Sequence, residues 1–367
     1  MQDCAKHHIE EILSKPINWD FLIKQSIYHD IAPLVYHNLR KINCSAIPDK
    51  VLSKFKKHYL CTLMNNRYFW SECCYLLKTF RNLGIKVVPL KGIIFAHIIY
   101  HDLGLRPMAD IDILVQEKDL PEVERILLQL NYKKHLAEYP EEFRRRYSYH
   151  SVYSKQITPG SVLPVEVHWN FTRPSAVRVF FPNIWSRVKK DIVDQQEVLS
   201  LSAEDALLQL CLQIKWHFPR RLILVCDVSE LLKQHRADLD WSYLIKEAKD
   251  NRVQFVLYFT LLFIKRLLGD SVPEDWLKRL QPGLIRRSLI RAYISNKKWF
   301  FQNRRGILAR IRMILLHLLL SERRKDFIIY ILSMPIEEFA QLYSLPLNSR
   351  RTLFLYCIRY LYIPFNF

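Results

Sequence analysis

The spacing of hydrophobic residues predicts helices in the first part of the chain. Apolar residues recur every three or four positions in residues 5–84, which is the period of an amphipathic helix. The pattern predicts short helices before Pro48, a further helix around Phe55, and a long helix over residues 59–82. Gly84 follows this helix and predicts its end, because glycine readily adopts the positive φ of a helix C-terminus.

Strands and helices alternate in the next part of the chain. The predicted strands cover residues 85–90, 110–115, 149–155 and 162–169, and the predicted helices cover 92–100 and 119–130. After residue 182 the pattern is helical again, with helices predicted after Ser202 and over residues 222–235. We therefore predict an α+β fold, in which a small mixed-sheet core (85–182) is flanked by an N-terminal helical region (1–84) and a C-terminal helical region (183–367).

Composition narrows the class of protein and the kind of partner. The 367 residues are 50% hydrophobic and 25% charged, which is typical of a globular protein and excludes a disordered one. Only 7 glycines are present, which favours long helices over a β-barrel. The net charge of +19 predicts an anionic partner such as a nucleotide, a nucleic acid, a polyphosphate or an acidic membrane surface. A solvated basic surface would explain the dispersed Arg and Lys doublets equally well.

Cysteine use and hydropathy indicate a cytoplasmic protein. The 8 cysteines show neither a CxxC motif nor metal-ligand spacing, so we expect reduced thiols. The first eight residues lack the apolar core of a signal peptide. No uncharged apolar stretch reaches the roughly 18 residues of a membrane helix, so we expect no integral membrane segment. The most apolar segment, residues 311–320, is interrupted by Arg312 and is predicted to be a buried helix.

Two aspartates in the predicted strand 110–115 are the strongest chemical signal. Residues two apart on a strand point to the same face, so Asp110 and Asp112 could share one divalent cation. Isolated Asp-x-Asp pairs are common and most bind no metal. Here, however, the pair lies among apolar β-formers, where two like charges are costly unless a cation compensates them. Lys91, Gly92 and Arg106 precede the pair, and together these residues suggest phosphoryl or nucleotidyl transfer.

A third acid and two histidines extend the candidate site. Glu166 and His168 are two apart on the strand predicted at 162–169, and a two-metal site for nucleotidyl transfer needs three carboxylates. An exposed strand glutamate is also common, and His168 could be structural, acceptor-side or metal-adjacent. His150 could face the same site from a neighbouring strand. Asp227 lies in a very apolar helix and needs a partner such as Arg221, unless it lines a nucleotide pocket.

Three runs of residues resemble a known family. They are Pro89-Leu90-Lys91-Gly92, the run Arg106-Pro107-Met108-Ala109-Asp110-Ile111-Asp112, and Glu166-Val167-His168-Trp169. Together they resemble the uncharacterised bacterial nucleotidyltransferases with a Leu-Lys-Gly motif, in the DNA polymerase β-like superfamily. The resemblance covers roughly residues 10–280, and its specificity lies in the combination of motifs.

The resemblance implies roles for particular residues. Asp110, Asp112 and Glu166 would hold Mg²⁺ or Mn²⁺ and form the catalytic acids. Lys91, Gly92 and Arg106 would bind the phosphates of an NTP such as ATP. His168, His150 and Asp227 would lie around the acceptor or behind these residues.

One motif departs from the wider superfamily. That superfamily usually has Gly-Ser or Gly-Gly at the glycine motif, whereas Gly92 is followed by Ile93, and 17 residues separate it from Asp110. Without the serine, Lys91 and Arg106 must make more of the phosphate contact. Toxin-type nucleotidyltransferases share a similar Lys-Gly pattern, so a toxin-like role stays open.

The sequence is therefore consistent with three functions. The first is a metal-dependent enzyme that transfers NMP from an NTP to an acceptor hydroxyl or phosphate on RNA, a sugar phosphate or a peptide. The second is a catalytically silent module of the same fold that binds nucleic acid or another anionic partner. The third is a peripheral membrane protein, which would need an exposed apolar face on its basic C-terminal helices. The sequence leaves open the acceptor, the preferred base, the number of metals and the oligomeric state.

Overall fold

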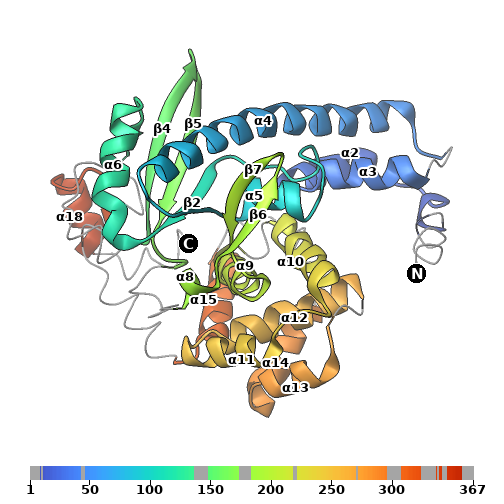
Figure 1. The fold of residues 1–367 in the computed structure, drawn as a ribbon. Helices are drawn as coiled ribbons and strands as arrows, with labels where there is room; N and C mark the ends of the chain where they lie inside the picture. Colours follow the sequence, from blue (N-terminus) through green and yellow to red (C-terminus); the bar gives the residue numbers. More distant parts are fainter. Residues whose placement is uncertain are drawn as a thin grey trace.

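A computed structural model shows the fold. It describes residues 9, 11–42, 46–135, 148–172, 183–217, 221–269, 272–295, 307–323, 336, 339–340 and 345–357. Within these residues a five-stranded mixed sheet is surrounded by helices, which confirms the predicted α+β class (Figure 1). None of the helices in this part of the chain is both long and apolar enough to cross a bilayer. The cysteines described are free, and Cys4 and Cys44 lie outside the described residues.

The sheet has the strand order β1-β2-β5-β4-β3. Strand β2 (Ile111–Val115) pairs antiparallel with β1 (Val87–Pro89) and parallel with β5 (Ser161–His168). Strand β4 (His150–Thr158) joins β5 in an antiparallel hairpin, and β3 (Lys133–Lys134) forms the edge. All five residues of β2 are buried. This interior position in the sheet explains why β2 is an almost continuous run of β-branched and aliphatic residues.

Helix α4 (Asp49–Asn82) is one continuous helix of 34 residues, whereas the pattern predicted two. The prediction of a break before residue 59 was wrong because the segment contains neither glycine nor proline, so nothing interrupts its backbone hydrogen bonds. At about 1.5 Å per residue the helix is about 50 Å long. It ends as predicted at Gly84, whose φ is +75°. The amides of Gly84 and Ile85 donate to the carbonyls of Arg81 and Phe80, which is a Schellman cap.

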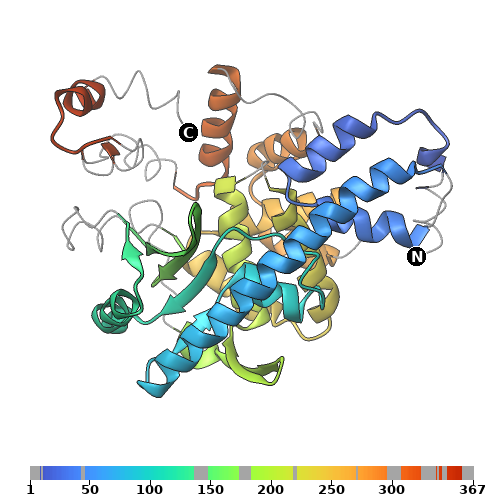
Figure 2. The same ribbon diagram turned by 90° about the horizontal axis from the view of Figure 1, so that it is seen from above.

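Two hydrophobic clusters lie along α4. Near its start, Val51 and Phe55 pack with α2 (Trp19–Tyr28) and α3 (Ala32–Ile42). From Trp70 onward its buried residues belong to a larger cluster that includes the sheet and the C-terminal helices. Figure 2 shows α4 running diagonally across the molecule, with the N-terminal helices at one end.

A β-hairpin follows residue 182, where the pattern predicted helices. Strands β6 (Lys189–Val193) and β7 (Gln196–Ser200) pair antiparallel after the short helix α8 (Ile184–Arg187). The helical prediction was wrong here because Asp194 and Gln195 adopt positive φ values of +45° and +63°, as in a tight primed turn. Side chains then alternate between the two faces of the hairpin, and the buried ones join the main core.

The remaining helices complete the described fold. Helix α9 (Ala203–His217) begins as predicted, with Ser202 Oγ accepting a hydrogen bond from the amide of Asp205 at 3.2 Å. Helix α10 (Leu222–His235) also has its predicted bounds. The other helices are α5 (Lys91–Ile98), the 3₁₀ turn η1 (Glu117–Asp119), α6 (Leu120–Gln129), α11 (Trp241–Asp250), α12 (Gln254–Leu268), α13 (Glu274–Leu280), α14 (Leu284–Ser295), α15 (Ile307–Leu320) and α18 (Arg350–Cys357).

Candidate functional site

The pairing of β2 with β5 brings the predicted acids together. Asp112 lies opposite Glu166 in the parallel register, and His168 is two residues further along β5. Register partners and residues two apart share a face of the sheet, so all three side chains lie on one face. Asp110 directly precedes β2. The structure thus gathers all three predicted carboxylates at the central pair of strands.

Asp112 is the most buried of the three acids and has two cationic or polar neighbours. Its side chain is 3% exposed, and its Oδ1 lies 3.0 Å from Lys91 Nζ and 2.7 Å from His168 Nε2. The backbone joins the same elements, because the amide of Leu90 donates to the Asp112 carbonyl at 2.9 Å. Lys91 begins α5 with a φ of +33°, a strained value for a residue with a side chain. Such strain is typical of functional sites, where surrounding contacts maintain it.

The charges of these groups stabilise one another. Burial opposes ionisation of Asp112, but Lys91 and the hydrogen bond from His168 outweigh it and hold the pKa of this carboxyl below its usual value. Burial also opposes ionisation of Glu166, and His168 again lowers the pKa. In turn, hydrogen bonds to both acids raise the pKa of His168 despite its burial. Lys91, and His168 when it is protonated, are therefore the counter-charges of Asp112 and Glu166.

Asp110 differs from the other two acids. Burial and the neighbouring charge of Asp112 raise the pKa of Asp110 to about 6, although Lys91 partly offsets this. Three ionised carboxylates beside Lys91 and His168 thus carry more negative charge than these two groups neutralise. A divalent cation would supply the missing positive charge, and carboxylate oxygens are the donors that Mg²⁺ and Mn²⁺ prefer.

This excess charge predicts that Asp110→Asn stabilises the metal-free protein in a pH-dependent way. A folded-state pKa above the unfolded value means that ionised Asp110 destabilises the fold, and this penalty develops as the pH rises from about 4 to about 6. The variant lacks the penalty, so its advantage in free energy of unfolding should be absent near pH 4 and complete above pH 6. Urea unfolding with EDTA across this range measures it.

The control for this experiment is Asp119→Asn, because Asp119 lies at the start of α6 and its side chain caps no backbone amide. It makes the same change of a carboxyl to an amide away from the acid site. A stability difference for Asp110→Asn that is constant with pH would contradict the assignment of the excess charge to Asp110.

Arg106 and Asp227 form a buried ion pair. Arg106 Nη2 lies 2.8 Å from Asp227 Oδ2, and the two side chains are 4% and 0% exposed. Tyr100 donates a further hydrogen bond to Asp227 at 2.9 Å. The suggested partner Arg221 was wrong: it pairs instead with Asp30 at 2.9 Å, because it precedes α10 and lies near the end of α2. In the structure, Arg106 thus connects the loop before the acid pair to α10, and its role as a phosphate ligand stays a prediction.

Gly92 lies against this ion pair. A Cβ atom at Gly92 would lie 2.9 Å from Arg106 Nη1 and 3.2 Å from Met108 Cβ, both too close. The guanidinium cannot easily move, because Asp227 holds it. The glycine therefore permits close approach of the Arg106 side chain, while its predicted approach to phosphates stays a prediction.

Gly92→Ala is accordingly expected to destabilise the protein. Alanine is normally favoured over glycine within a helix by about 1 kcal/mol, but overpacking of a buried contact costs about 1–3 kcal/mol. The clash should exceed the gain in helix propensity and lower the melting temperature. Thermal unfolding measures this, and Gly283→Ala is the control, since a Cβ atom there meets nothing within 4 Å. A melting temperature for Gly92→Ala at or above that of the parent would contradict the expected clash.

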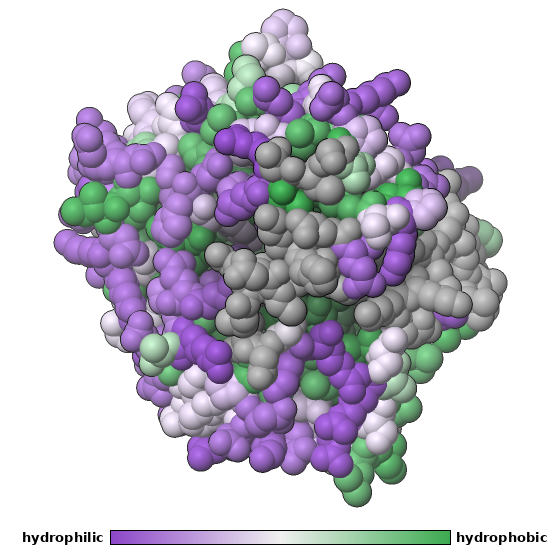
Figure 3. Space-filling view, turned by 90° about the vertical axis from the view of Figure 1, so that its right-hand side faces the viewer, coloured by the Kyte–Doolittle hydropathy of each residue, from purple (hydrophilic) through white to green (hydrophobic). Residues whose placement is uncertain are grey.

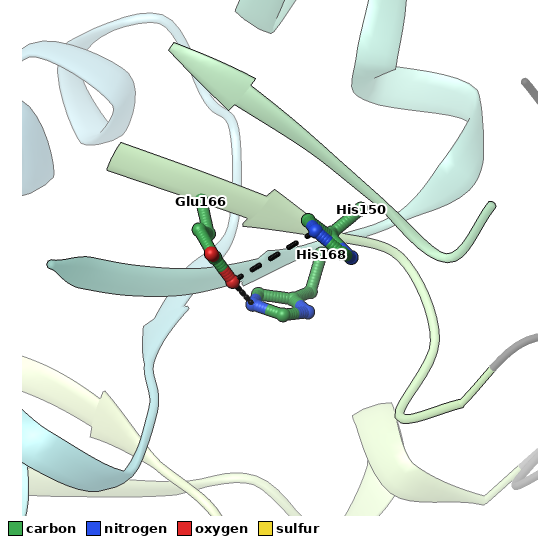
Figure 4. A group of neighbouring side chains, drawn as sticks. All are labelled: His150, Glu166 and His168. Atoms are coloured by element: carbon green, nitrogen blue, oxygen red, sulfur yellow. Dashed lines mark ion pairs between the residues drawn. The ribbon is translucent and has the colours of Figure 1, made fainter. Parts of the chain in front are cut away.

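His150 lies beside His168, as the sequence suggested. The two are register partners on β4 and β5, and their rings are 5.1 Å apart. His150 Nε2 is 4.0 Å from Glu166 Oε2, and His168 Nε2 is 3.3 Å from the same oxygen. Figure 4 shows the three side chains converging from the two strands. They are the group of histidines and acids among the described residues whose atoms lie close enough to hold one metal ion.

Sequence reasoning missed two residues that support this site. Tyr100 contacts Asp227 across 127 positions of the chain, and no local signal predicts such a contact. Asn66, in the middle of α4, is fully buried and donates to the carbonyls of Leu103 and Arg106 at 2.6 and 2.9 Å. An asparagine within an otherwise apolar stripe was the available signal, because a buried amide needs partners.

Comparison with known proteins identifies the family of the chain. The family model described as uncharacterised nucleotidyltransferase matches residues 15–269, which include every candidate residue. None of the curated protein sequences matches the chain. A solved structure of an antigenic nucleotidyltransferase-like protein from Paracoccidioides brasiliensis is similar over 50% of this chain and 89% of its own, with 13% identity and a TM-score of 0.30. A likeness at this level carries no argument, but the family match covers well over half of the chain. The chain therefore belongs to the uncharacterised nucleotidyltransferase family.

Proposed function

We propose that the protein is an Mg²⁺- or Mn²⁺-dependent enzyme that transfers NMP from an NTP to an acceptor hydroxyl or phosphate. The observation that carries the proposal is the convergence of Asp110, Asp112 and Glu166, next to Lys91, in a chain of the nucleotidyltransferase family. An acceptor oxygen attacks the α-phosphorus, the bond between the α-phosphorus and its bridging oxygen breaks, and pyrophosphate leaves. When bound, the cation would neutralise phosphate charge and lower the pKa of the acceptor hydroxyl.

The protein's own residues would supply orientation and charge. Asp110, Asp112 and Glu166 are the donors for the cation, and their oxygen chemistry fits it. Lys91 neutralises Asp112 in the structure. Its ammonium group lies beside the acids, where it could also pair with a phosphate of the NTP. Positioning of the triphosphate against the acceptor supplies much of the rate in such reactions, because little covalent chemistry is asked of the protein.

Label transfer tests the proposal. The protein is incubated with Mg²⁺ or Mn²⁺ and each of the four α-labelled NTPs, with total RNA, small metabolites and protein extract as separate acceptor pools. Label transferred by the parent and not by Asp110→Ala/Asp112→Ala supports the proposal and identifies the pool that contains the acceptor. NTP binding without transfer in any pool supports the alternative, a catalytically silent module with an anionic partner. The absence of NTP binding overturns the proposal.

The exposed apolar residues of α14 favour a second candidate, peripheral membrane binding. Leu284, Ile285 and Leu289 are 71%, 78% and 53% exposed, and Arg291 on the same helix is also exposed. Figure 3 shows that apolar patches interrupt a largely hydrophilic surface on one face of the molecule. Apolar side chains beside arginines fit the interface of an anionic bilayer.

Vesicle sedimentation tests this second candidate. We expect more protein to bind vesicles that contain phosphatidylserine than vesicles of phosphatidylcholine alone, and salt should weaken this binding because it screens the arginines. Ile285→Glu should reduce the bound fraction, whereas Ser288→Glu, with the same charge change on the same helix, is the matched comparison. Equal binding of all three proteins would exclude α14 as the membrane contact.

A further inference from the structure

A mixed group of nitrogen and oxygen donors lies at the end of β5. His150, Glu166 and His168 each offer one ligand atom, and these atoms lie within 4.8 Å of one another. The strand register fixes this arrangement, because His150 pairs directly with His168 and Glu166 is two residues before it (Figure 4). Ligand atoms around a single ion are separated by distances of this order, so one cation could contact all three.

Asp112 adds a second carboxylate to the group. Its Oδ1 lies 2.7 Å from the same His168 Nε2 that is 3.3 Å from Glu166 Oε2. His168 Nε2 therefore faces both carboxylates. A cation between these three groups could be bound by the imidazole and by both acids. A bound metal would take both carboxylates and the imidazole as ligands.

Exposure of the group is graded in a way that fits entry from solvent. His168 and Asp112 are each 3% exposed, whereas the side chains of His150 and Glu166 are 22% and 24% exposed. A cation arriving from solvent would meet His150 and Glu166 before it reached the buried pair. The four residues come from three neighbouring strands of one sheet, so the protein backbone holds them in place without a mobile loop.

The donor set argues against Mg²⁺ as the preferred ion. Mg²⁺ takes oxygen ligands and retains several waters, whereas imidazole nitrogens suit the divalent ions of the first transition series. We propose that His150 and His168, with Glu166 and Asp112, form a site that selects a first-row transition-metal dication such as Mn²⁺ or Zn²⁺ over Mg²⁺. The proposal rests on the proposed function for its place in the reaction, because two of its ligands are acids of that site, but binding itself can be measured alone.

Metal binding to the protein without NTP tests the proposal. Calorimetric titration of the metal-free full chain with MnCl₂, ZnCl₂ and MgCl₂ should give Mn²⁺ and Zn²⁺ dissociation constants at least about tenfold lower than that of Mg²⁺. Electron spin-echo spectra of bound Mn²⁺ should show couplings to imidazole nitrogen. His150→Gln and His168→Asn should each raise the Mn²⁺ dissociation constant by about tenfold or more and weaken the nitrogen signal, since loss of groups that only orient a ligand already costs about 10–100-fold.

His135→Gln is the matched control, because His135 is exposed and its ring hydrogen-bonds Ser154, four residues along β4 from His150. It should leave both measurements unchanged. His150→Gln keeps the test valid if the buried His168→Asn fails to fold. Equal affinity for Mn²⁺ and Mg²⁺, or Mn²⁺ spectra without nitrogen couplings, would overturn the proposal. Selective binding without label transfer from any NTP would instead remove the proposed function and leave the metal site intact.

Discussion

Replacing Asp112 with asparagine is expected to reduce nucleotidyl transfer by about a thousandfold or more, which corresponds to about 4 kcal/mol of transition-state stabilisation. Asp112 lies at the centre of the site, with Lys91 and His168 on its carboxylate and Glu166 opposite it on β5. The amide retains the shape of the side chain but loses the charge that would hold the cation. Single-turnover rates with the labelled NTP and the acceptor identified above measure the loss.

Asp119→Asn is again the control for a change of one carboxyl to an amide, and it should retain full activity. Asp112→Asn also removes the partner of Lys91, so its folding must be checked separately. Circular dichroism and thermal unfolding provide this check. A folded Asp112→Asn protein with a rate within tenfold of the parent would show that Asp112 does not hold the metal. The reaction would then need another site in the chain.

Asp227→Ala is expected to lower the free energy of unfolding by about 3–5 kcal/mol, the largest stability effect that the structure predicts. The substitution leaves the Arg106 guanidinium buried without its carboxylate, and it also removes the acceptor for the Tyr100 hydroxyl. The double replacement Arg106→Met/Asp227→Leu should recover much of this loss, because a well-packed apolar pair avoids burying an unpaired charge. Urea unfolding at 25 °C measures each variant.

Glu230→Gln is the control for loss of an ion pair on the same helix. Glu230 pairs with Lys233 at the surface, and such pairs contribute little, so the free energy of unfolding should hardly change. If Asp227→Ala were no more destabilising than Glu230→Gln, the Arg106–Asp227 pair would not be a structural link between the loop before the acid pair and α10.

The sequence predicted the parts of the fold that depend on local patterns. Apolar runs and turn residues gave β2, β4 and β5, and Ser202 marked the start of α9, because strand alternation and helix capping act over a few residues. The convergence of Asp112 with Glu166 was also predictable, because each acid lies on a predicted strand and the two strands could pair in one sheet. The fold does not test the predicted roles of Asp110, Asp112 and Glu166 as metal ligands or of Lys91, Gly92 and Arg106 as phosphate ligands.

The contacts that the sequence did not predict are those that depend on tertiary packing. Asp227 was matched to Arg221 because the two are close in sequence, yet its partner Arg106 is 121 positions away. Local charge patterns favour near neighbours, whereas a buried carboxylate selects whichever cation packs against it. The same limit applies to the hairpin β6–β7, whose turn depends on two residues with positive φ that are neither glycine nor asparagine.

Helix α4 runs through two hydrophobic clusters, and Leu34 of α3 also packs against the larger one. Its first turns pack with α2 and α3, and its later turns pack with the sheet. Between them, Tyr59 and Asn66 hydrogen-bond the loop that leads to the acid pair. Local opening of the N-terminal cluster would thus release one end of this helix while the other end stayed folded. The loop before the acid pair contacts α4 between the two clusters. This loop should therefore stay ordered only if the middle of α4 stays folded when the N-terminal cluster opens.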